Sequence, residues 1–218
     1  MSFSNNKYQV IKNVISKELT EFIFNYLILK KDAVKYMYQN NIVNETSTLG
    51  TWKDKNFPNI YSHYADFVME TLLLKVMPII SKATNLDLIP TYSFARIYEK
   101  GSILKRHKDR SACEISTTLN LGGDLWSIFI DPTGNDNVIN GNIIKDDASK
   151  GIKIDLEPSD MLIYEGYELE HWREQFTGNI CVQVFLHYNN INGKFKDGNL
   201  YDKRPMLGTP YFAKTNKL

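Results

Sequence analysis

The segment Lys105-Arg106-His107-Lys108-Asp109-Arg110 contains the pair of residues from which the fold can be inferred. His107 and Asp109 are two positions apart, so on an extended strand their side chains lie on the same face. An imidazole and a carboxylate placed in this way can bind one side of a metal ion. With a further histidine they make a 2-His-1-carboxylate triad, the donor set of non-haem Fe(II) sites with open coordination positions. We expect His171 to be that histidine.

The residues around this pair supply the context that a short His-x-Asp pattern needs. A strand-like segment, Phe94–Tyr98, precedes the pair and is followed by a glycine turn at Gly101. After the pair, the turn 157–160 leads into the apolar segment Met161–Tyr164, and His171 follows on the next predicted strand. This order favours a ligand role for His171 over the alternative, a histidine that merely occupies a strand face.

Length and composition indicate a single globular domain. The 218 residues are enough for one sizeable core, and 43% hydrophobic and 23% charged residues are typical of soluble proteins. The net charge of +1 provides no basic field for nucleic acid. Cys113 and Cys181 form no CxxC pair, so we expect reduced and partly buried thiols. Met1–Val10 lacks an apolar signal segment, and the apolar run Leu72–Ile80 is too short for a bilayer. These features predict a cytoplasmic protein without a membrane partner.

The single domain, 1–218, divides by composition into three parts. Residues 1–86 are mainly helical in pattern, 87–191 are β-rich with short segments and turns between them, and 192–218 form a polar tail. Strands at this spacing predict a sandwich or barrel. The tail either wraps the surface or is partly disordered, and the polar insert 131–150 is a loop that could contain a hairpin.

Local patterns predict the individual elements. Apolar residues at helical spacing predict helices from Ser16 to Lys31 and from near Tyr61 to Asn85, with Pro78 as a kink or a new helix start. Tyr8–Val14 alternates and predicts a strand. Further strands are predicted near Leu88–Glu99, Leu104–His107, Ile115–Leu121, Trp126–Ile130, Val138–Ile144, Ile152–Leu156, Asp160–Tyr164, Glu170–Phe176 and Ile180–Tyr188.

As a set, these residues resemble the Fe(II)/2-oxoglutarate-dependent dioxygenases, in particular their prolyl-4-hydroxylase-like branch. The resemblance lies in the pattern Tyr98-x2-Gly101-x5-His107-x-Asp109, the Pro-x-Asp turn and the later His171. The segments Pro90–Tyr98 and Glu168–Glu174 also resemble those of a group of uncharacterised bacterial and phage proteins. The match covers about residues 88–189, which is roughly half of the chain.

The resemblance implies a mainly β fold and an oxidative activity. The fold is a double-stranded β-helix, of jelly-roll or cupin type, with the N-terminal helices packed on one sheet. His107, Asp109 and His171 are then the metal ligands and the catalytic centre, with Fe(II), 2-oxoglutarate and O2 as cofactor and cosubstrates. The implied reaction hydroxylates a C–H bond and releases succinate and CO2. A peptidyl proline or another amino-acid side chain is the first substrate candidate, and a small molecule is the second.

The chain departs from the family pattern where 2-oxoglutarate is held. Many members use Arg or Lys on the last strand, nine or ten residues after the distal histidine, but Ile180 and Cys181 stand here. A buried dianion needs a cation or several hydrogen bonds. Arg173 and Arg96 are the available replacements, because each shares a strand face with a motif residue. We favour Arg173; for both, an exposed strand-face arginine is the alternative.

Three further residues are candidates for the cosubstrate site. Tyr98 matches a tyrosine that contacts 2-oxoglutarate in the prolyl hydroxylases, although a core aromatic is the alternative. Thr118 and Asn120 lie with Ser116 on one face of a predicted strand, and Asn120 stands where related enzymes have a tyrosine. That polar face lines a pocket or else faces solvent.

The charged residues next to the motif have two interpretations. Lys105, Arg106 and Arg110 could guide an anionic substrate or cosubstrate, but a solvated run of charge is the ordinary reading of such a segment. Neither an RNA-recognition pattern nor a continuous basic stripe is present, so no nucleic-acid partner is expected. The sequence leaves the oligomeric state open.

Two other functions remain open from the sequence. The missing basic residue on the last strand is consistent with a catalytically silent β-helix that serves as a binding or structural module. It is equally consistent with a non-haem iron enzyme that does not use 2-oxoglutarate. The presence of all three potential metal ligands favours an oxygenase over the silent module.

Overall fold

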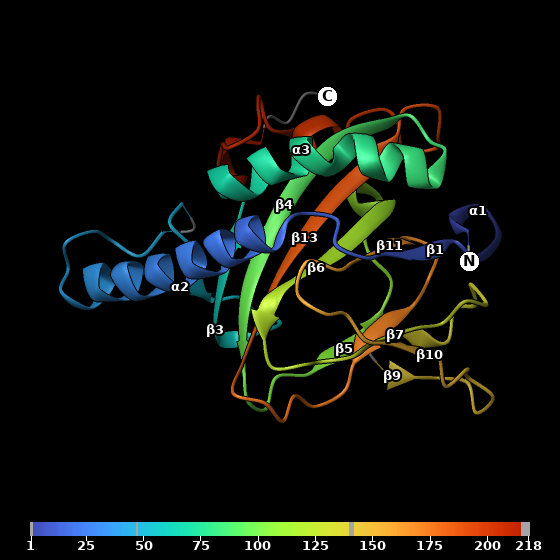
Figure 1. Ribbon diagram of the computed structural model, residues 1–218, viewed down its shortest axis with the longest axis horizontal. Helices are drawn as coiled ribbons and strands as arrows, with labels where there is room; N and C mark the ends of the chain where they lie inside the picture. The colour runs from blue at the N-terminus through green and yellow to red at the C-terminus, as the bar shows by residue number, and fades with distance from the viewer. Residues whose placement is uncertain (1, 47, 140–141, 215–218) are drawn as a thin grey trace.

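The computed structural model describes residues 2–46, 48–139 and 142–214, which form two facing antiparallel sheets with helices on one side (Figure 1). The larger sheet has the order β1 (Tyr8–Ile11), β11 (Met161–Glu165), β6 (Ile115–Gly123), β13 (Ile180–Asn190), β4 (Leu88–Glu99), β3 (Pro58–Tyr64) and β2 (Thr51–Lys53). The smaller sheet has the order β10 (Ile152–Ile154), β7 (Ile128–Ile130), β12 (His171–Arg173) and β5 (Leu104–His107).

The inner faces of the two sheets pack on each other. Buried apolar side chains of the larger sheet, such as Leu162, contact those of the smaller sheet, such as Ile128 and Ile130. The long strands β4 and β13 pair along their whole length and form the centre of the larger sheet. This arrangement is the double-stranded β-helix that the sequence predicted.

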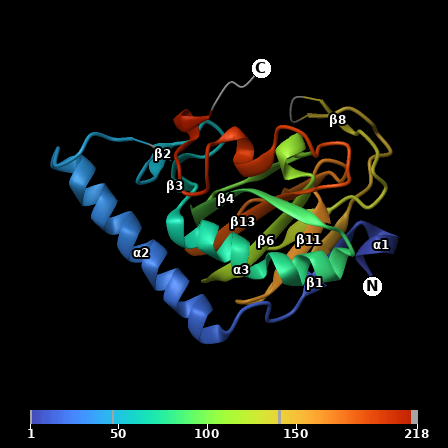
Figure 2. The ribbon, with the colours of Figure 1, turned by 90° about the horizontal axis from the view of Figure 1, so that it is seen from above.

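The outer face of the larger sheet is covered by the N-terminal helices (Figure 2). Helix α2 (Lys17–Gln39) and helix α3 (Phe67–Thr84) pack on residues such as Ala95, Ile97 and Val184, and a short helix α1 (Phe3–Asn6) precedes β1. Alternation along the strands therefore divides the larger sheet into an apolar outer face and an inner face with many polar residues. The packing of the helices on one sheet confirms the predicted arrangement.

Helix α2 is longer than predicted. It begins after Ser16, whose hydroxyl caps Leu19 N at 3.2 Å, and continues to Gln39 instead of ending near Lys31. The extra turns carry a buried Val34, so the apolar face extends beyond the segment in which the spacing was clearest. Packing decided this boundary, as is common for helix ends.

The predicted start of the second helix was wrong. Tyr61 belongs to β3, where it pairs with Ile97 of β4, and α3 starts only after Asp66. The Asp66 carboxylate accepts hydrogen bonds from the N–H groups of Val68 and Met69 at 2.9 and 3.1 Å, which is an N-cap. The spacing of aromatics before Asp66 fitted a helix by chance, and pairing with β4 determined the strand. The predicted end at Asn85 is confirmed.

The predicted core strands are confirmed, with small shifts at their ends. Leu88–Glu99 and Leu104–His107 agree in both bounds, whereas the strand that contains His171 is only three residues long. The single strand predicted near Val138–Ile144 was wrong. The insert contains two short antiparallel strands instead, β8 (Val138–Ile139) and β9 (Asn142–Ile143), in agreement with the predicted loop that could contain a hairpin. Three short 3-10 turns complete the described chain: η1 (Ser111–Cys113), η2 (Leu200–Lys203) and η3 (Tyr211–Ala213).

The described part of the tail, 192–214, wraps over α3 and β4. Arg204 is buried and forms an ion pair with Glu70 of α3 at 2.6 Å. Asp202 receives a bidentate pair of hydrogen bonds from Arg110 at 2.6 and 2.7 Å. Ion pairs of this kind hold a segment that has no apolar periodicity of its own. Residues 215–218 lie outside the described part. No described helix has the length and hydropathy needed to span a membrane.

Candidate metal and cosubstrate site

The structure brings His107, Asp109 and His171 together between the two sheets. β5 and β12 are antiparallel neighbours in which His171 lies directly opposite His107. The Nε2 atoms of His107 and His171 lie 3.5 and 3.6 Å from Asp109 Oδ1. One donor atom from each residue can thus be chosen so that all lie within 4.8 Å of one another, as around a shared metal ion. Asp109 follows the end of β5 and is not part of the strand itself.

Hydrogen bonds to backbone carbonyls fix the orientation of both imidazoles. His107 Nδ1 lies 2.7 Å from the carbonyl of Lys105, and His171 Nδ1 lies 3.1 Å from the carbonyl of Leu169. A carbonyl only accepts, so each Nδ1 carries a proton, and each Nε2 is the ring atom that faces Asp109. Such outer hydrogen bonds set the tautomer and ring orientation of metal-binding histidines.

Asp109 is held by contacts on both sides. Its backbone N–H donates to the carbonyl of Gly166 at 2.8 Å, and its Oδ2 accepts from the Ser116 hydroxyl at 2.7 Å. Burial alone would raise the pKa of this carboxyl, but His171 and His107 hold the pKa well below its usual range. Asp109 is therefore ionised at neutral pH, and its Oδ1 is the oxygen available to a cation.

Gly166 provides the space for this carboxylate, which yields a first prediction. A methyl group at Gly166 would lie 2.4 Å from Ser116 Oγ and 2.5 Å from Asp109 Oδ2. We expect Gly166→Ala to displace Asp109 and weaken metal affinity at least about 10-fold, as when a hydrogen-bond partner of a ligand is lost. The dissociation constant for Ni(II), measured by calorimetry, checks this.

Gly101→Ala is the control for Gly166→Ala. Gly101 has positive φ and no atom within 4 Å of an added Cβ, so its substitution strains the backbone without touching the triad. Unchanged Ni(II) affinity in Gly166→Ala would contradict the role of Gly166 as the space for Asp109.

Arg173 lies on the same inward face of β12 as His171 and is completely buried, with 1% of its surface exposed. It donates to the carbonyl of Trp126 and to Thr118 Oγ1, the latter at 3.3 Å, while its Nε has no partner. No carboxylate among the described residues is within ion-pair distance. Burial of the uncompensated charge lowers the pKa of Arg173. A buried guanidinium without a counter-ion is expected to bind an anion.

The Tyr98 hydroxyl is a second unpaired polar group in this region. Tyr98 is fully buried, and its hydroxyl has no hydrogen-bond partner in the described structure. Its ring packs against Trp126 at 4.8 Å and Phe57 at 5.2 Å between centroids. Buried tyrosine hydroxyls normally find a partner, and the Arg96 guanidinium is close enough to this one to interact with it electrostatically.

The other candidates differ in how free they are. The Thr118 hydroxyl accepts a hydrogen bond from Arg173 and donates one to the side-chain Oε1 of Gln183 at 3.0 Å. The amide of Asn120 bonds to Leu156 O at 2.7 Å, Gly122 N at 3.0 Å and Gln183 at 3.1 Å. Asn120 thus lies on the inner face, but these backbone and side-chain bonds already engage its polar atoms.

Arg96 also points inward, but its charge is compensated. It forms an ion pair with Asp54 at 2.7 Å and lies over the rings of Phe57 and Phe94 at 4.2 and 4.7 Å. Asp54 is remote in sequence, in a loop that the sequence did not connect with Arg96. Of the two arginines considered for the cosubstrate, only Arg173 lacks an acidic partner within the described ranges.

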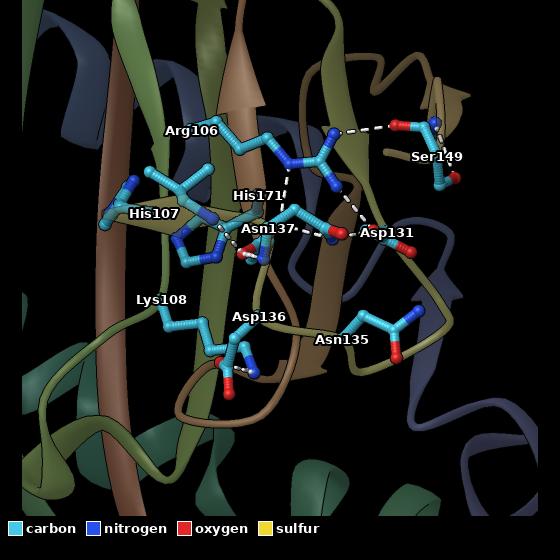
Figure 3. A network of polar contacts seen from close by, with 12 residues as sticks. Arg106, His107, Lys108, Asp131, Asn135, Asp136, Asn137, Ser149 and His171 are labelled. Atoms are coloured by element: carbon cyan, nitrogen blue, oxygen red, sulfur yellow. Dashed lines mark hydrogen bonds and ion pairs between the residues drawn. The ribbon is translucent and has the colours of Figure 1, made fainter. Parts of the chain in front are cut away.

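The ordinary interpretation of the charge run next to the motif was wrong for Arg106, whereas Lys105 and Arg110 are exposed, as that interpretation expects. Arg106 is buried and forms ion pairs with Asp131 and Glu170 on the outer side of the smaller sheet (Figure 3). Arg110 pairs with Asp202 of the tail. The acidic partners lie far away in sequence, so no local pattern could reveal them.

Sequence reasoning missed Gly166 and the role of Ser116 toward Asp109. Gly166 lies in the turn between β11 and β12, and its only sequence signal is a glycine five residues before the distal histidine. His187 bonds to Ser116 Oγ at 3.0 Å and lies outside the triad. Burial lowers the pKa of His187 to about 4. Cys113 and Cys181 are both buried and unbonded to each other, as expected.

Comparisons with known proteins add to this geometry. No protein-family model and no curated protein matches the sequence. Among solved structures, HygX from Streptomyces hygroscopicus with nickel and 2-oxoglutarate bound is similar at a TM-score of 0.60 and 13% identity, over 87% of this chain and 85% of that chain. A prolyl-4-hydroxylase from Pseudomonas putida is similar at a TM-score of 0.51 and 13% identity, over 86% and 95%.

A third similar structure is SnoN, a non-haem α-ketoglutarate-dependent epimerase from nogalamycin biosynthesis. Its TM-score is 0.59 at 10% identity, over 86% of this chain and 80% of that chain. The chain therefore has the double-stranded β-helix fold that iron and 2-oxoglutarate-dependent enzymes share.

Proposed function

We propose that this protein is a non-haem Fe(II) oxygenase that uses 2-oxoglutarate and O2. The single observation that carries the proposal is the His107–Asp109–His171 donor set beside the buried, uncompensated Arg173. The donor set and the buried arginine would each be unfavourable without a bound ligand. The triad concentrates donor groups at short distance, and Arg173 is a buried cation without an anion.

The donor set fits iron. Two neutral imidazole nitrogens and one ionised carboxylate oxygen, grouped on one side, match the facial arrangement used by Fe(II) oxygenases. His107 is 38% exposed, whereas His171 is 3% exposed, so the side near His107 is the accessible one. A molecule from solvent would reach the three ligands from that side.

The surroundings of Arg173 fit 2-oxoglutarate. The two residues from His171 to Arg173 span about 6.6 Å of strand, which suits a short dicarboxylate with one end at the metal. Arg173 and the Tyr98 hydroxyl would bind the far carboxylate, and Thr118 orients the guanidinium. Trp126 and Phe176, both buried, enclose this end and keep water from it.

Iron with 2-oxoglutarate and O2 would supply oxidation of an unactivated C–H bond, with release of succinate and CO2. The residues of the chain hold the ligands in place, keep Asp109 ionised and exclude water. We propose hydroxylation as the outcome. SnoN, an α-ketoglutarate-dependent epimerase, is an example of this fold with another outcome.

We place the substrate in a cavity of about 290 Å³ on the inner face beside β4. Tyr64, Tyr92, Phe94 and Tyr211 line it with Arg110. Tyr92 packs on His187 at 4.5 Å, and the chain His187–Ser116–Asp109 links the cavity to the metal site. This volume suits a small molecule or one side chain of a peptide. HygX has been solved with nickel, 2-oxoglutarate and hygromycin B, which supports a small-molecule substrate.

One spectroscopic experiment tests the function. Fe(II) and 2-oxoglutarate added under anaerobic conditions should give a weak visible metal-to-ligand absorption band, and air should then yield succinate even without substrate. Iron binding without the band would instead support an iron enzyme that does not use 2-oxoglutarate. Absence of iron binding would support a silent binding module.

A further inference from the structure

Each of the two histidines of the triad is preceded in sequence by a charged residue that points away from the site. Arg106 precedes His107 and Glu170 precedes His171, so alternation places this pair on the outer face of the smaller sheet. Both are buried, at 7% and 2% exposed, and Arg106 Nε donates to Glu170 Oε2 at 2.7 Å. The pair thus joins the two histidine strands from behind the metal site.

Glu170 also binds the insert between β7 and β10. Its carboxylate accepts hydrogen bonds from the backbone N–H of Asn137 at 2.6 Å and of Val138 at 3.1 Å, and from the Asn137 amide at 3.0 Å. The backbone carbonyl of Glu170 accepts a hydrogen bond from the backbone N–H of Asp131 at 2.8 Å. The segment 131–138 is therefore fixed onto the residue next to His171.

Arg106 binds both ends of the same insert (Figure 3). It donates to the Asp131 carboxylate and, at 2.6 Å, to the carbonyl of Ser149. Its guanidinium lies over the ring of Trp172 at 4.3 Å. Every charged group in this network has several partners, which is the condition under which buried charges are tolerated.

The strand pairing between the histidines is weak enough to need such support. β5 has four residues, β12 has three, and their register shifts between His171 and Arg173. Few ladder hydrogen bonds therefore set the separation of His107 and His171. The Arg106–Glu170 pair adds a fixed cross-strand link one residue before both ligands.

We propose that Arg106 and Glu170 are positioning residues that hold His107 and His171 at metal-binding separation, and that they couple the segment 131–138 to metal binding. This inference rests on the proposed function, because it assumes that the triad binds a metal. Since coupling is reciprocal, the metal must stabilise the segment as much as the segment stabilises the metal site.

Glu170→Gln tests the proposal, because it keeps the size of the side chain but removes its charge. We expect the Ni(II) dissociation constant to rise roughly 10- to 100-fold and the visible spectrum of the Co(II)-loaded protein to change. Metal should protect the amides of 131–138 from hydrogen exchange in the wild type, and this protection should be lost in the variant.

Glu168→Gln is the matched control. Glu168 lies two residues earlier, is 37% exposed and pairs with Lys194 at 2.5 Å, so its loss should change none of these readouts. Asn137→Ala is the second variant if Glu170→Gln does not fold. It removes one neutral donor to Glu170 and Asp131, and a smaller change in the same direction is expected.

Two outcomes would overturn the inference in distinguishable ways. If Glu170→Gln, or Asn137→Ala in its place, lowers the melting temperature but leaves metal affinity and the Co(II) spectrum unchanged, the network serves stability alone. If the wild type binds no metal, the proposed function fails and the positioning role fails with it.

Discussion

His107→Ala is expected to abolish both the Fe(II)–2-oxoglutarate absorption band and succinate formation in a protein that remains folded. A facial triad binds through three donors, so loss of one should weaken the metal by more than the roughly 10- to 100-fold typical of losing an outer hydrogen-bond partner. His107 is the ligand of choice for this test because its side chain is 38% exposed, against 3% for His171. Little packing is lost, and thermal unfolding without metal should change little.

The control for this variant is a buried histidine outside the triad. His63 lies on β3 and interacts with Thr48 O at 3.0 Å and with Asp66 at 3.2 Å, away from the triad. His63→Gln should lower stability while leaving iron binding and the band intact. An unaltered band in His107→Ala would show that the iron lies elsewhere.

Arg173→Met is expected to remove 2-oxoglutarate binding while leaving the protein without cosubstrate at least as stable as the wild type. Removing one partner of a buried ion pair costs about 3–5 kcal/mol. Applied to the bound cosubstrate, this raises its dissociation constant more than about 100-fold. Without cosubstrate the substitution should raise the free energy of unfolding or leave it unchanged, because an apolar side chain replaces a buried charge that has no counter-ion. Thermal unfolding with and without 2-oxoglutarate measures both effects.

Arg96→Met is the matched control for the cosubstrate anchor. Arg96 already has Asp54 as its partner, so its loss should reduce 2-oxoglutarate affinity far less. If both variants bind 2-oxoglutarate as well as the wild type, neither arginine is the anchor. If only Arg96→Met loses binding, the assignment to Arg173 is wrong.

Much of the fold follows from local patterns in the sequence. Short β-rich segments with turn residues between them predicted Leu88–Glu99 and Leu104–His107 with their bounds, although Leu88–Glu99 is buried on both faces. Alternation of side chains along a strand placed Arg173 on the inner face with His171. The predicted start of α3 was wrong. The aromatic residues near Tyr61 fit a helix as well as a strand, and only pairing with β4 makes this segment a strand.

The sequence by itself identified the three potential metal ligands and the two strands that carry His107 and His171. Only the tertiary structure distinguished Arg173 from Arg96, because the difference is an acidic neighbour: Asp54 lies beside Arg96, and no described carboxylate lies beside Arg173. The structure also showed that Arg106, which the charge run predicted to be solvated, is buried and forms an ion pair with Glu170. Periodicity reports which face a side chain occupies, whereas its charge partner comes from a distant segment that only folding brings close.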